Sequence, residues 1–406
     1  MSANQNEPVL VAGGGIGGLA AALALVRQGY RVKVLEQAPE LGEIGAGIQL
    51  GPNAFHAFDA LGVGPQARAR AVYTDYMVMH DAIDEYQVGQ IPTGEAFRQR
   101  FGNPYAVIHR ADVHLSLLEG AQASGRIECL TDTRAVRIEQ DANGVTVHDH
   151  KGRSHHGRAL IGADGVKSVV REQFVGDPAR VTGHVVYRAV VEKKDFPVDL
   201  QWNAASIWVG PNCHLVHYPL RGGEQYNVVV TFHSRKQEEW GMTDGSKEEV
   251  QSYFQGICPK ARQLIDLPKS WRRWATADRE PIGRWTYGRV TCWVTLLTRR
   301  PSTWPRGPAW PWKTRSHWAR HCGSATRTGP EHWTYIKRHA WGVRPVSSCP
   351  VARWGASTMP RASSAGCAMI CGAVARLSAF MTPWIGFMAG MWTIACKPLA
   401  METANE

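Results

Sequence analysis

The chain has 406 residues, of which 44% are hydrophobic and 20% are charged. This length and composition fit a globular protein with a large core, and they exclude an intrinsically disordered chain and a small disulfide-stabilised domain. The formal net charge of +11 would suggest nucleic acid or an anionic membrane as a partner. That charge, however, comes from one end of the chain.

Residues 292–406 differ in composition from the residues before them. They hold 14 of the 46 Lys and Arg residues but only 3 of the 35 Asp and Glu residues, which leaves 32 of each in residues 1–291. Ten of the 16 Trp and six of the nine Cys residues also follow Thr291. The first 291 residues therefore form a neutral body, and two composition classes share one chain.

The N-terminal residues show no basic segment followed by a long apolar stretch, so they predict no secretory signal. Before residue 292 the cysteines are Cys129, Cys213 and Cys258, without a CxxC pair. This pattern fits a reducing compartment and gives no zinc signature. We therefore expect a cytoplasmic protein and no metal site.

A glycine-rich turn near the N-terminus predicts a dinucleotide site. The pattern is strand, glycine turn, helix and second strand, over Val9–Ala12, Gly13–Gly18, Leu19–Val26 and Val32–Leu35. Gly13, Gly15 and Gly18, with Ile16 among them, allow a tight turn and close approach of a pyrophosphate to the helix N-terminus. Glu36 ends the second strand and can accept hydrogen bonds from ribose hydroxyls. The pattern alone does not distinguish FAD from NAD.

Three further motifs decide between these cofactors. They are Asp164-Gly165 in the strand-turn-helix pattern of Leu160 to Arg171, Gly45-Ala46-Gly47-Ile48-Gln49-Leu50, and His109-Arg110-Ala111-Asp112. With the glycine turn, these motifs resemble the group A flavoprotein aromatic hydroxylases, the family of 4-hydroxybenzoate, salicylate and 3-hydroxybenzoate hydroxylases. The resemblance covers roughly residues 7–291 and implies FAD. It also implies an α/β fold, with a Rossmann-like FAD-binding domain that has a parallel sheet and an inserted antiparallel-sheet substrate domain.

The resemblance implies positions for the domains and for two cofactor contacts. Residues 1–178, with 270–291 returning, would form the FAD-binding domain, and residues 179–269 the substrate-binding sheet. Asp164 would accept hydrogen bonds from flavin ribityl or ribose hydroxyls. Arg110 would lie along the FAD. The alternative for Arg110 is a surface arginine at the start of a helix.

Alternation predicts the strands of the substrate sheet: Val185–Val191, Ser206–Val209, His214–Tyr218 and Tyr226–Phe232, with Arg221-Gly222-Gly223 as a turn. Period two places His214, Val216 and Tyr218 on one face, and Leu215 and His217 on the other. A separate hairpin is predicted around Asn143-Gly144, with Ala135–Gln140 and Val145–His148 as its strands. Four histidines near its end, His148, His150, His155 and His156, are given no role.

His214 and Tyr218 are the catalytic candidates. A phenol titrates near about pH 10, so a neutral imidazole that accepts a hydrogen bond from it favours the phenolate, whose ring is electron-rich. The resemblance to the 3-hydroxybenzoate 6-hydroxylases implies this role for both residues, because the corresponding histidine and tyrosine of that subgroup have it. A structural sheet histidine is the alternative. Tyr105 and Gln49 are substrate-pocket candidates, although an aromatic residue after proline is more often part of the packing.

The implied activity is that of an NAD(P)H-dependent flavin monooxygenase, with NADH or NADPH and O₂ as co-substrates. The subgroup that this chain resembles most converts 3-hydroxybenzoate to 2,5-dihydroxybenzoate (gentisate). Salicylate hydroxylation to catechol is the alternative within the family. A non-catalytic remnant that has lost flavin binding through its altered C-terminus is the alternative of another class. The sequence leaves a homodimer open and predicts neither a nucleic-acid nor a membrane partner.

The family pattern ends at Gly288-Arg289-Val290-Thr291, where the resemblance implies a following Gly-Asp-Ala-Ala-His-Pro motif. Shifting the frame by one base recovers it. Trp293 is encoded by TGG and Val294 by GTN, so the overlapping triplet is GGT, glycine. The next triplets can encode Asp-Ala-Ala-His-Pro-Thr. We hypothesise a one-base slip near Thr291, with residues 292–406 translated out of frame.

Two other interpretations compete for this segment. Alternating Arg and Trp residues from Arg299 to Arg344 could form a nucleic-acid surface. The uncharged stretch from Leu377 to Cys396 is long enough for a membrane span, although Pro383 and several glycines weaken a helix there. The slip explains both features and the loss of acidic residues together.

The slip predicts that resequencing the gene will show a missing or extra base near codon 291. An uninterrupted, quality-checked frame that encodes the printed residues 292–406 would rule the hypothesis out.

Overall fold

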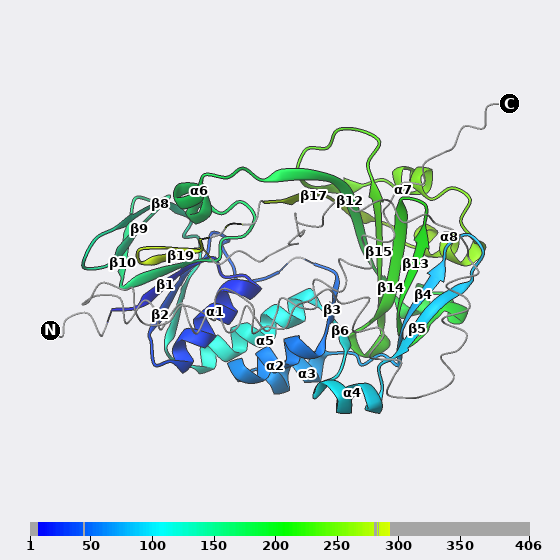
Figure 1. The fold of residues 1–406 in the computed structure, drawn as a ribbon, viewed down its shortest axis with the longest axis horizontal. Helices are drawn as coiled ribbons and strands as arrows, with labels where there is room; N and C mark the ends of the chain where they lie inside the picture. The colour runs from blue at the N-terminus through cyan, green and yellow to red at the C-terminus, as the bar shows by residue number, and fades with distance from the viewer. Residues whose placement is uncertain (1–6, 44, 280–281, 283, 293–406) are drawn as a thin grey trace, which may run out of the picture. The chain divides into compact units, whose positions relative to one another are not determined.

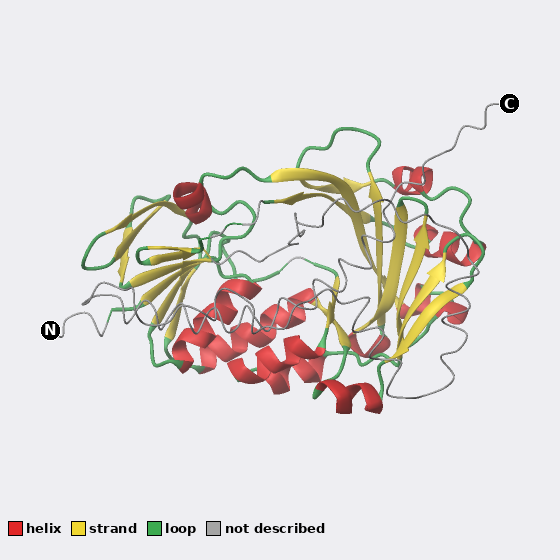
Figure 2. Ribbon diagram, in the orientation of Figure 1, coloured by secondary structure: helices red, strands yellow, loops and turns green. Residues whose placement is uncertain are grey.

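The computed structural model describes residues 7–43, 45–279, 282 and 284–292, and these residues belong to one compact unit. Two large sheets, with six and eight strands, dominate the described part (Figures 1 and 2). The predictions for residues 293–406, including the reading-frame slip, the nucleic-acid surface and the membrane span, lie outside the described residues.

The six-stranded sheet has the order β18-β19-β11-β1-β2-β7, and all neighbours pair in parallel except β18 and β19. β1 lies in the interior of this order because each of its four side chains is apolar and buried, as expected for a parallel strand that is covered on both faces. The strand bounds are β1 Val9–Ala12, β2 Val32–Leu35, β7 Ile127–Leu130, β11 Ala159–Gly162, β18 Thr286–Tyr287 and β19 Val290–Cys292.

Helix α1 (Ile16–Arg27) covers one face of this sheet. Ala21 and Leu25 pack on the side chains of β1 and β2, whereas Leu19 and Leu23 pack against the neighbouring helices. The helix is buried on both sides because its Ala- and Leu-rich sequence has no polar face. The neighbouring helices are α2 (Pro52–Leu61), α3 (Gly64–Arg70) and α5 (Arg110–Ala123).

A small antiparallel sheet and helix α6 (Val169–Val175) pack on the other face of the six-stranded sheet. Its order is β10-β9-β8, with β8 at Ala135–Gln140, β9 at Val145–Asp149 and β10 at Ser154–Gly157. The hairpin predicted around Asn143-Gly144 is therefore confirmed. Two histidines near it pair with acidic residues, His155 with Asp149 and His148 with Glu139.

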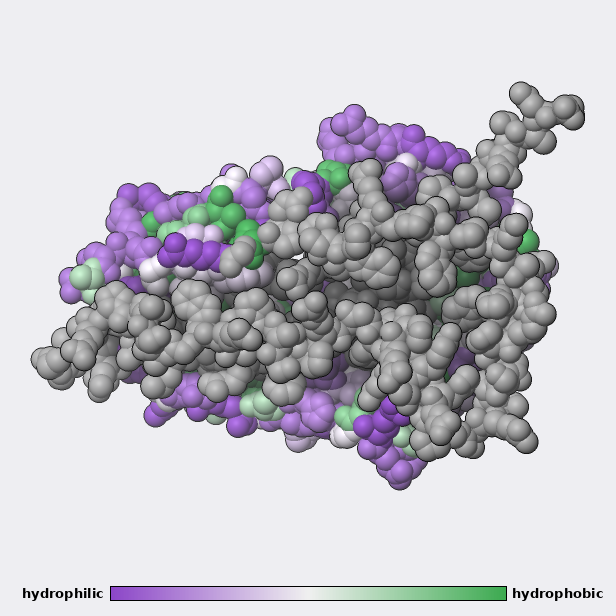
Figure 3. Space-filling model, viewed as in Figure 1, coloured by the Kyte–Doolittle hydropathy of each residue, from purple (hydrophilic) through white to green (hydrophobic). Residues whose placement is uncertain are grey.

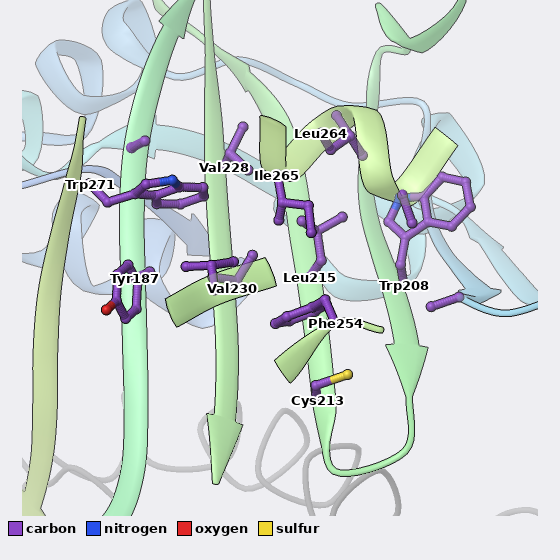
Figure 4. Packing of buried hydrophobic residues seen from close by; sticks show 14 of the residues in the cluster. Tyr187, Trp208, Cys213, Leu215, Val228, Val230, Phe254, Leu264, Ile265 and Trp271 are labelled. Atoms are coloured by element: carbon purple, nitrogen blue, oxygen red, sulfur yellow. The ribbon is translucent and has the colours of Figure 1, made fainter. Parts of the chain in front are cut away.

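The eight-stranded sheet has the order β16-β17-β12-β15-β14-β13-β4-β5. Apolar side chains alternate along its central strands, so one face forms a separate core with helices α7 (Lys247–Tyr253) and α8 (Pro259–Asp266). Figure 4 shows Leu215 of β14 and Val228 and Val230 of β15 in this core, with Phe254 and Leu264 packed beside them. We call this side the outer face. The bounds are β4 Tyr76–Asp81, β5 Gln87–Pro92, β12 Arg180–Glu192, β13 Ala204–Gly210, β14 Cys213–Leu220, β15 Gln225–His233, β16 Gly241–Gly245 and β17 Trp271–Asp278.

The opposite side, the inner face, packs on a two-stranded ribbon of β3 (Gly47–Leu50) and β6 (Ala106–His109). Val107 of β6, together with Tyr105 just before it, contacts Val216, Tyr218 and Leu220 of β14. The short helix α4 (Glu95–Phe101), by contrast, has no buried residue, and Figure 3 shows a hydrophilic surface over it. The ribbon therefore joins the helices that cover the six-stranded sheet to the second sheet.

The predicted α/β fold class and the four predicted strands of the second sheet are confirmed. The sheet also contains strands that the sequence did not place there. β4 pairs in parallel with β13, and β5 follows β4 as the edge strand. Their partner lies more than a hundred residues away along the chain, so no local pattern indicates the pairing.

The turn after β1 gives a test of the fold. A Cβ atom at Gly18 would lie 1.8 Å from the carbonyl oxygen of Gly13, a backbone atom that cannot move aside. We expect Gly18→Ala to lower the free energy of unfolding by about 1–3 kcal/mol or more, as overpacking does. Urea unfolding measures this change. Gly89→Ala on β5 is the control, because no atom lies within 4 Å of its added methyl group; equal stabilities of the two variants would contradict the prediction.

Candidate active site

The carboxyl ends of the parallel strands bring three loops to one edge of the six-stranded sheet. They are the glycine turn after β1, Glu36 after β2, and Ala163-Asp164 after β11. The chain order of the strands reverses at this point, because β2 and β7 lie on one side of β1 and β11 and β19 on the other. Open α/β sheets bind their ligands at such a switch point.

The glycine turn leaves room for a ligand against the start of α1. Gly13 has φ +101°, and a Cβ atom there would lie 2.3 Å from the carbonyl oxygen of Ala163. Gly15 precedes the first residue of α1, and among the described residues no side chain forms a cap hydrogen bond there. With the helix dipole, the first N–H groups of α1 can therefore bind an anion.

Glu36 stabilises the glycine turn through backbone hydrogen bonds. Its carboxylate accepts one hydrogen bond from the backbone N–H of Gly14 at 2.5 Å and another from Ala38 at 2.8 Å. A carboxylate has about four acceptor positions, so these two bonds leave capacity for a ligand hydroxyl.

Asp164 lies across from the glycine turn, at the end of the adjacent strand. Its carboxylate accepts hydrogen bonds from Ser168 Oγ at 2.5 Å and from the N–H of Val170 at 3.2 Å. Burial raises the pKa of Asp164, and the hydrogen bond from Ser168 opposes that shift. The fold thus brings this acid to the same edge as Gly13 and Glu36.

Arg110 begins α5 and forms a two-pronged ion pair with Glu43, with N···O distances of 2.9 and 3.2 Å. Glu43 reaches the start of α1, because its Oε1 would lie 3.3 Å from a Cβ atom on Gly15. Arg110 therefore lies beside the anion site of α1. The structure shows it paired with an acid and partly exposed.

The inner face of the second sheet carries both catalytic candidates. His214 and Tyr218 are buried on β14 and face the same way as Val216, whereas Leu215 belongs to the outer core. The predicted alternation along β14 is confirmed. His217 faces the outer side, where its Nδ1 accepts a hydrogen bond from Trp208 Nε1 at 3.3 Å.

The β3–β6 ribbon fits closely over Tyr218. A Cβ atom at Gly47 would lie 2.4 Å from the Tyr218 ring. The N–H of Gly47 donates to Asn227 Oδ1 at 2.8 Å, which ties β3 to β15. Nearby, the hydroxyl of Tyr105 donates to Gln49 Oε1 at 2.6 Å, and Tyr105 packs in one cluster with Tyr218. Three of the substrate-side candidates, Tyr218, Tyr105 and Gln49, thus come together, and His214 lies on the same face of β14 four residues before Tyr218.

Burial sets the charge of these groups. It lowers the pKa of His214 to about 4, with His184 adding to the shift, so the imidazole is neutral at pH 7. Burial raises the pKa of Tyr218, and the charge of Arg188 opposes this shift. Tyr218 therefore keeps its proton and can donate a hydrogen bond, while His214 can accept one.

The FAD binding domain family matches residues 6–293. Over 292 residues the chain is 84% identical to a 3-hydroxybenzoate 6-hydroxylase of Polaromonas naphthalenivorans (strain CJ2), a match that covers 72% of this chain and 73% of that protein. The chain belongs to the group A flavoprotein aromatic hydroxylases. A 3-hydroxybenzoate 6-hydroxylase of Klebsiella oxytoca is 61% identical over 282 residues, which are 70% of this chain and 71% of that protein.

A solved structure of this fold is that of Klebsiella pneumoniae HpxO complexed with FAD and uric acid. It matches with a TM-score of 0.61 and 26% identity, over 71% of this chain and 72% of that one. The described residues of this hydroxylase fit FAD as its cofactor. The glycine turn has no Cβ atoms in the way, the start of α1 is an anion site, and two carboxylates flank it.

Three residues of this site were missed by the sequence interpretation. His114 donates from Nε2 to the carbonyl oxygen of Gly14 at 2.8 Å and so anchors α5 to the glycine turn. Its spacing of four from Arg110 puts both on one side of α5, which could have indicated it. Asn227 and Arg188 lie on the inner face. Each of the two residues lies between apolar residues that face the outer core, and this alternation could have indicated their inward orientation from the sequence.

Among the described residues, no group of three or more His, Cys, Asp or Glu residues could hold a metal ion. Within the same part of the chain, no helix is long and apolar enough to cross a membrane.

The buried histidines predict acid sensitivity. The pKa is lowered by burial to about 4 for His214 and, with His80 adding, to about 3 for His217, against about 6.5 in an unfolded chain. At pH values between the folded-state and the unfolded-state pKa, the unfolded chain binds protons that the folded chain does not. The contribution of each histidine to the free energy of unfolding is therefore present above about pH 6.5 and is lost as the pH falls below it. From pH 7 to pH 5 we expect the free energy of unfolding to fall by about 2 kcal/mol for each histidine.

Urea unfolding of the wild type and of His217→Gln at both pH values measures this effect. The variant lacks one of the two titrating groups, so its loss of stability on acidification should be smaller by about 2 kcal/mol. Equal losses in the two proteins would show that His217 does not titrate differently on folding.

Proposed function

We propose that this hydroxylase converts 3-hydroxybenzoate to 2,5-dihydroxybenzoate, with NADH and O₂ as co-substrates. The observation that carries the proposal is the pair His214 and Tyr218, which are buried on the inner face of β14, with the β3–β6 ribbon packed over Tyr218. The names of the two relatives support it, because carbon 6 of 3-hydroxybenzoate is para to the hydroxyl group. Hydroxylation there gives the 2,5-diol.

The residues at the edge of the six-stranded sheet would hold FAD. Gly13, Gly15, Ile16 and Gly18 would surround the pyrophosphate at the start of α1, and Glu36 would accept from the adenosine ribose. Asp164 would accept from the ribityl chain, and Arg110 would lie along the cofactor. Bound FAD would supply the redox chemistry, which is the oxidation of NADH coupled to the use of O₂ for ring hydroxylation, with water as the other product.

His214 and Tyr218 would handle the proton of the substrate hydroxyl. The neutral His214 accepts a hydrogen bond from the phenol, which shifts electron density onto the ring carbon para to it. Tyr218 keeps its own proton and donates to the same oxygen, so negative charge on that oxygen is stabilised. The substrate hydroxyl oxygen would thus contact a hydrogen-bond acceptor, His214, and a hydrogen-bond donor, Tyr218.

Tyr105 and Gln49 would line the substrate site. Their mutual hydrogen bond of 2.6 Å satisfies the buried Tyr105 hydroxyl and fixes both side chains beside Tyr218. A rigid wall of this kind orients the aromatic ring and excludes water from the reacting carbon.

We also propose a division into an FAD-binding domain, residues 1–178 with 270–291, and a substrate domain, residues 179–269. In the structure the eight-stranded sheet also contains β4, β5 and β17. We further propose a cytoplasmic location and a homodimer.

The activity test is substrate-stimulated NADH oxidation by the full chain purified with FAD. We expect 3-hydroxybenzoate to stimulate oxidation and to yield 2,5-dihydroxybenzoate on chromatography. Stimulation by salicylate alone, with catechol as product, would replace the proposed substrate. A colourless protein that FAD cannot reconstitute would instead identify a non-catalytic remnant.

A His214 variant separates the proposed chemistry from binding. His214→Asn keeps a polar side chain on β14 but removes the imidazole, and general acid–base groups contribute about 10²- to 10⁴-fold to rates. We expect kcat to fall by that factor while FAD content is retained. His217→Gln, on the opposite face of the same strand, is the control, and equal kcat values for the two variants would refute the role of His214.

A further inference from the structure

Arg188 lies on the inner face of the second sheet, in line with the catalytic candidates. It is part of β12, where Val185, Tyr187 and Ala189 face the outer core, so Arg188 faces the other way. Its register partner on β15 is Val229, which is paired in turn with Val216 of β14. Arg188 therefore shares a face with His214 and Tyr218, two strands away.

Three arginines of the described chain whose side chains are at most 12% exposed have carboxylate partners. Arg171 and Arg279 pair with Asp177, and Arg273 pairs with Glu238 and Glu249. These pairs follow the general rule that a charge removed from water is matched by an opposite charge.

Arg188 departs from this rule within the described part of the chain. Its one hydrogen bond is long, 3.4 Å from Nη1 to the carbonyl oxygen of Gly47, and its guanidinium lies 5.9 Å from the centre of the Trp274 ring. No described carboxylate forms an ion pair with it. Burial lowers the pKa of Arg188, so the fold holds a cation there at a cost in free energy.

We propose that Arg188 binds the carboxylate of the aromatic acid substrate, while His214 and Tyr218 hold its hydroxyl. The inference rests on the proposed function and adds to it the residue that selects a benzoate over a neutral phenol. A guanidinium matches a carboxylate with two parallel N–H···O bonds, so it fixes the orientation of the ring as well as its charge. With both ends of the substrate held, one ring carbon is presented for hydroxylation.

The test compares an acid with its uncharged analogue. Isothermal titration calorimetry measures the binding of 3-hydroxybenzoate and 3-hydroxybenzamide to the full chain carrying oxidised FAD. For Arg188→Gln we expect the affinity for the acid to fall about 30- to 1,000-fold, as in other truncations of a buried charge pair, and the affinity for the amide to change less than about threefold. Arg188→Lys keeps a point charge without the planar fork, so its preference for the acid should be intermediate.

Arg272→Gln is the matched control. Arg272 is the register partner of Arg188 on β17, but its side chain is exposed and already pairs with Asp244. We expect it to keep the wild-type preference for the acid. FAD content confirms that each variant is folded, and Arg188→Lys supplies the readout if Arg188→Gln does not fold.

The results distinguish a failure of the proposed function from a failure of the role of Arg188. If the wild type binds neither compound, the proposed function fails and the role of Arg188 fails with it. If the wild type prefers the acid but Arg188→Gln loses affinity for acid and amide equally, or for neither, the function stands and the carboxylate role of Arg188 is overturned. Equal loss would instead indicate a role in packing or toward the flavin.

Discussion

The close contact between Gly47 and the ring of Tyr218 determines where the two halves of the site meet. A side chain on Gly47 would overlap the Tyr218 ring, and the N–H of Gly47 is held by Asn227 across the same contact. β3 also leads into α2, which packs with α1 in one core. A strand that is continuous with the helical layer thus lies directly on the substrate sheet. This packing therefore holds the substrate sheet against the helices that cover the six-stranded sheet.

Burial on the inner face determines which groups carry charge. Desolvation keeps His214 neutral and Tyr218 protonated, so the pair offers one acceptor and one donor at neutral pH. Burial does not neutralise Arg188, because a guanidinium stays protonated in proteins. It remains a cation beside two neutral polar groups. A ligand with a hydroxyl at one end and a negative charge at the other complements this arrangement, and hydroxybenzoates have that form.

Much of this fold follows from local sequence patterns. The buried run of β1, the glycine turn and the alternation along β14 are each short-range signals with a direct physical cause, and they predicted the strands and the shared face of His214 and Tyr218. Pairings across long stretches of chain were not predictable. β4 reaches β13, and His114 reaches Gly14, through tertiary packing that leaves no periodic trace in the sequence. Asp164 and Glu36 were predicted as ligand acceptors, but their bonds to Val170, Gly14 and the Ser168 hydroxyl depend on loop geometry that composition does not specify.

The position of β19 explains why the reading frame after Cys292 matters to the site. β19 pairs in parallel with β11, so its carboxyl end points to the same edge as Gly13 and Asp164. Cys292, the last described residue of the chain, therefore lies at the edge where FAD would bind. In an open α/β sheet, loops at this edge supply ligand contacts. The Gly-Asp-Ala-Ala-His-Pro segment that the resemblance implies after Thr291 contains small residues and a carboxylate, whereas the printed sequence continues with Trp293-Val294-Thr295, which contains a bulky residue and no acid. A one-base slip would thus change the cofactor side of the site and leave the inner-face residues of β12, β14 and β15 as encoded.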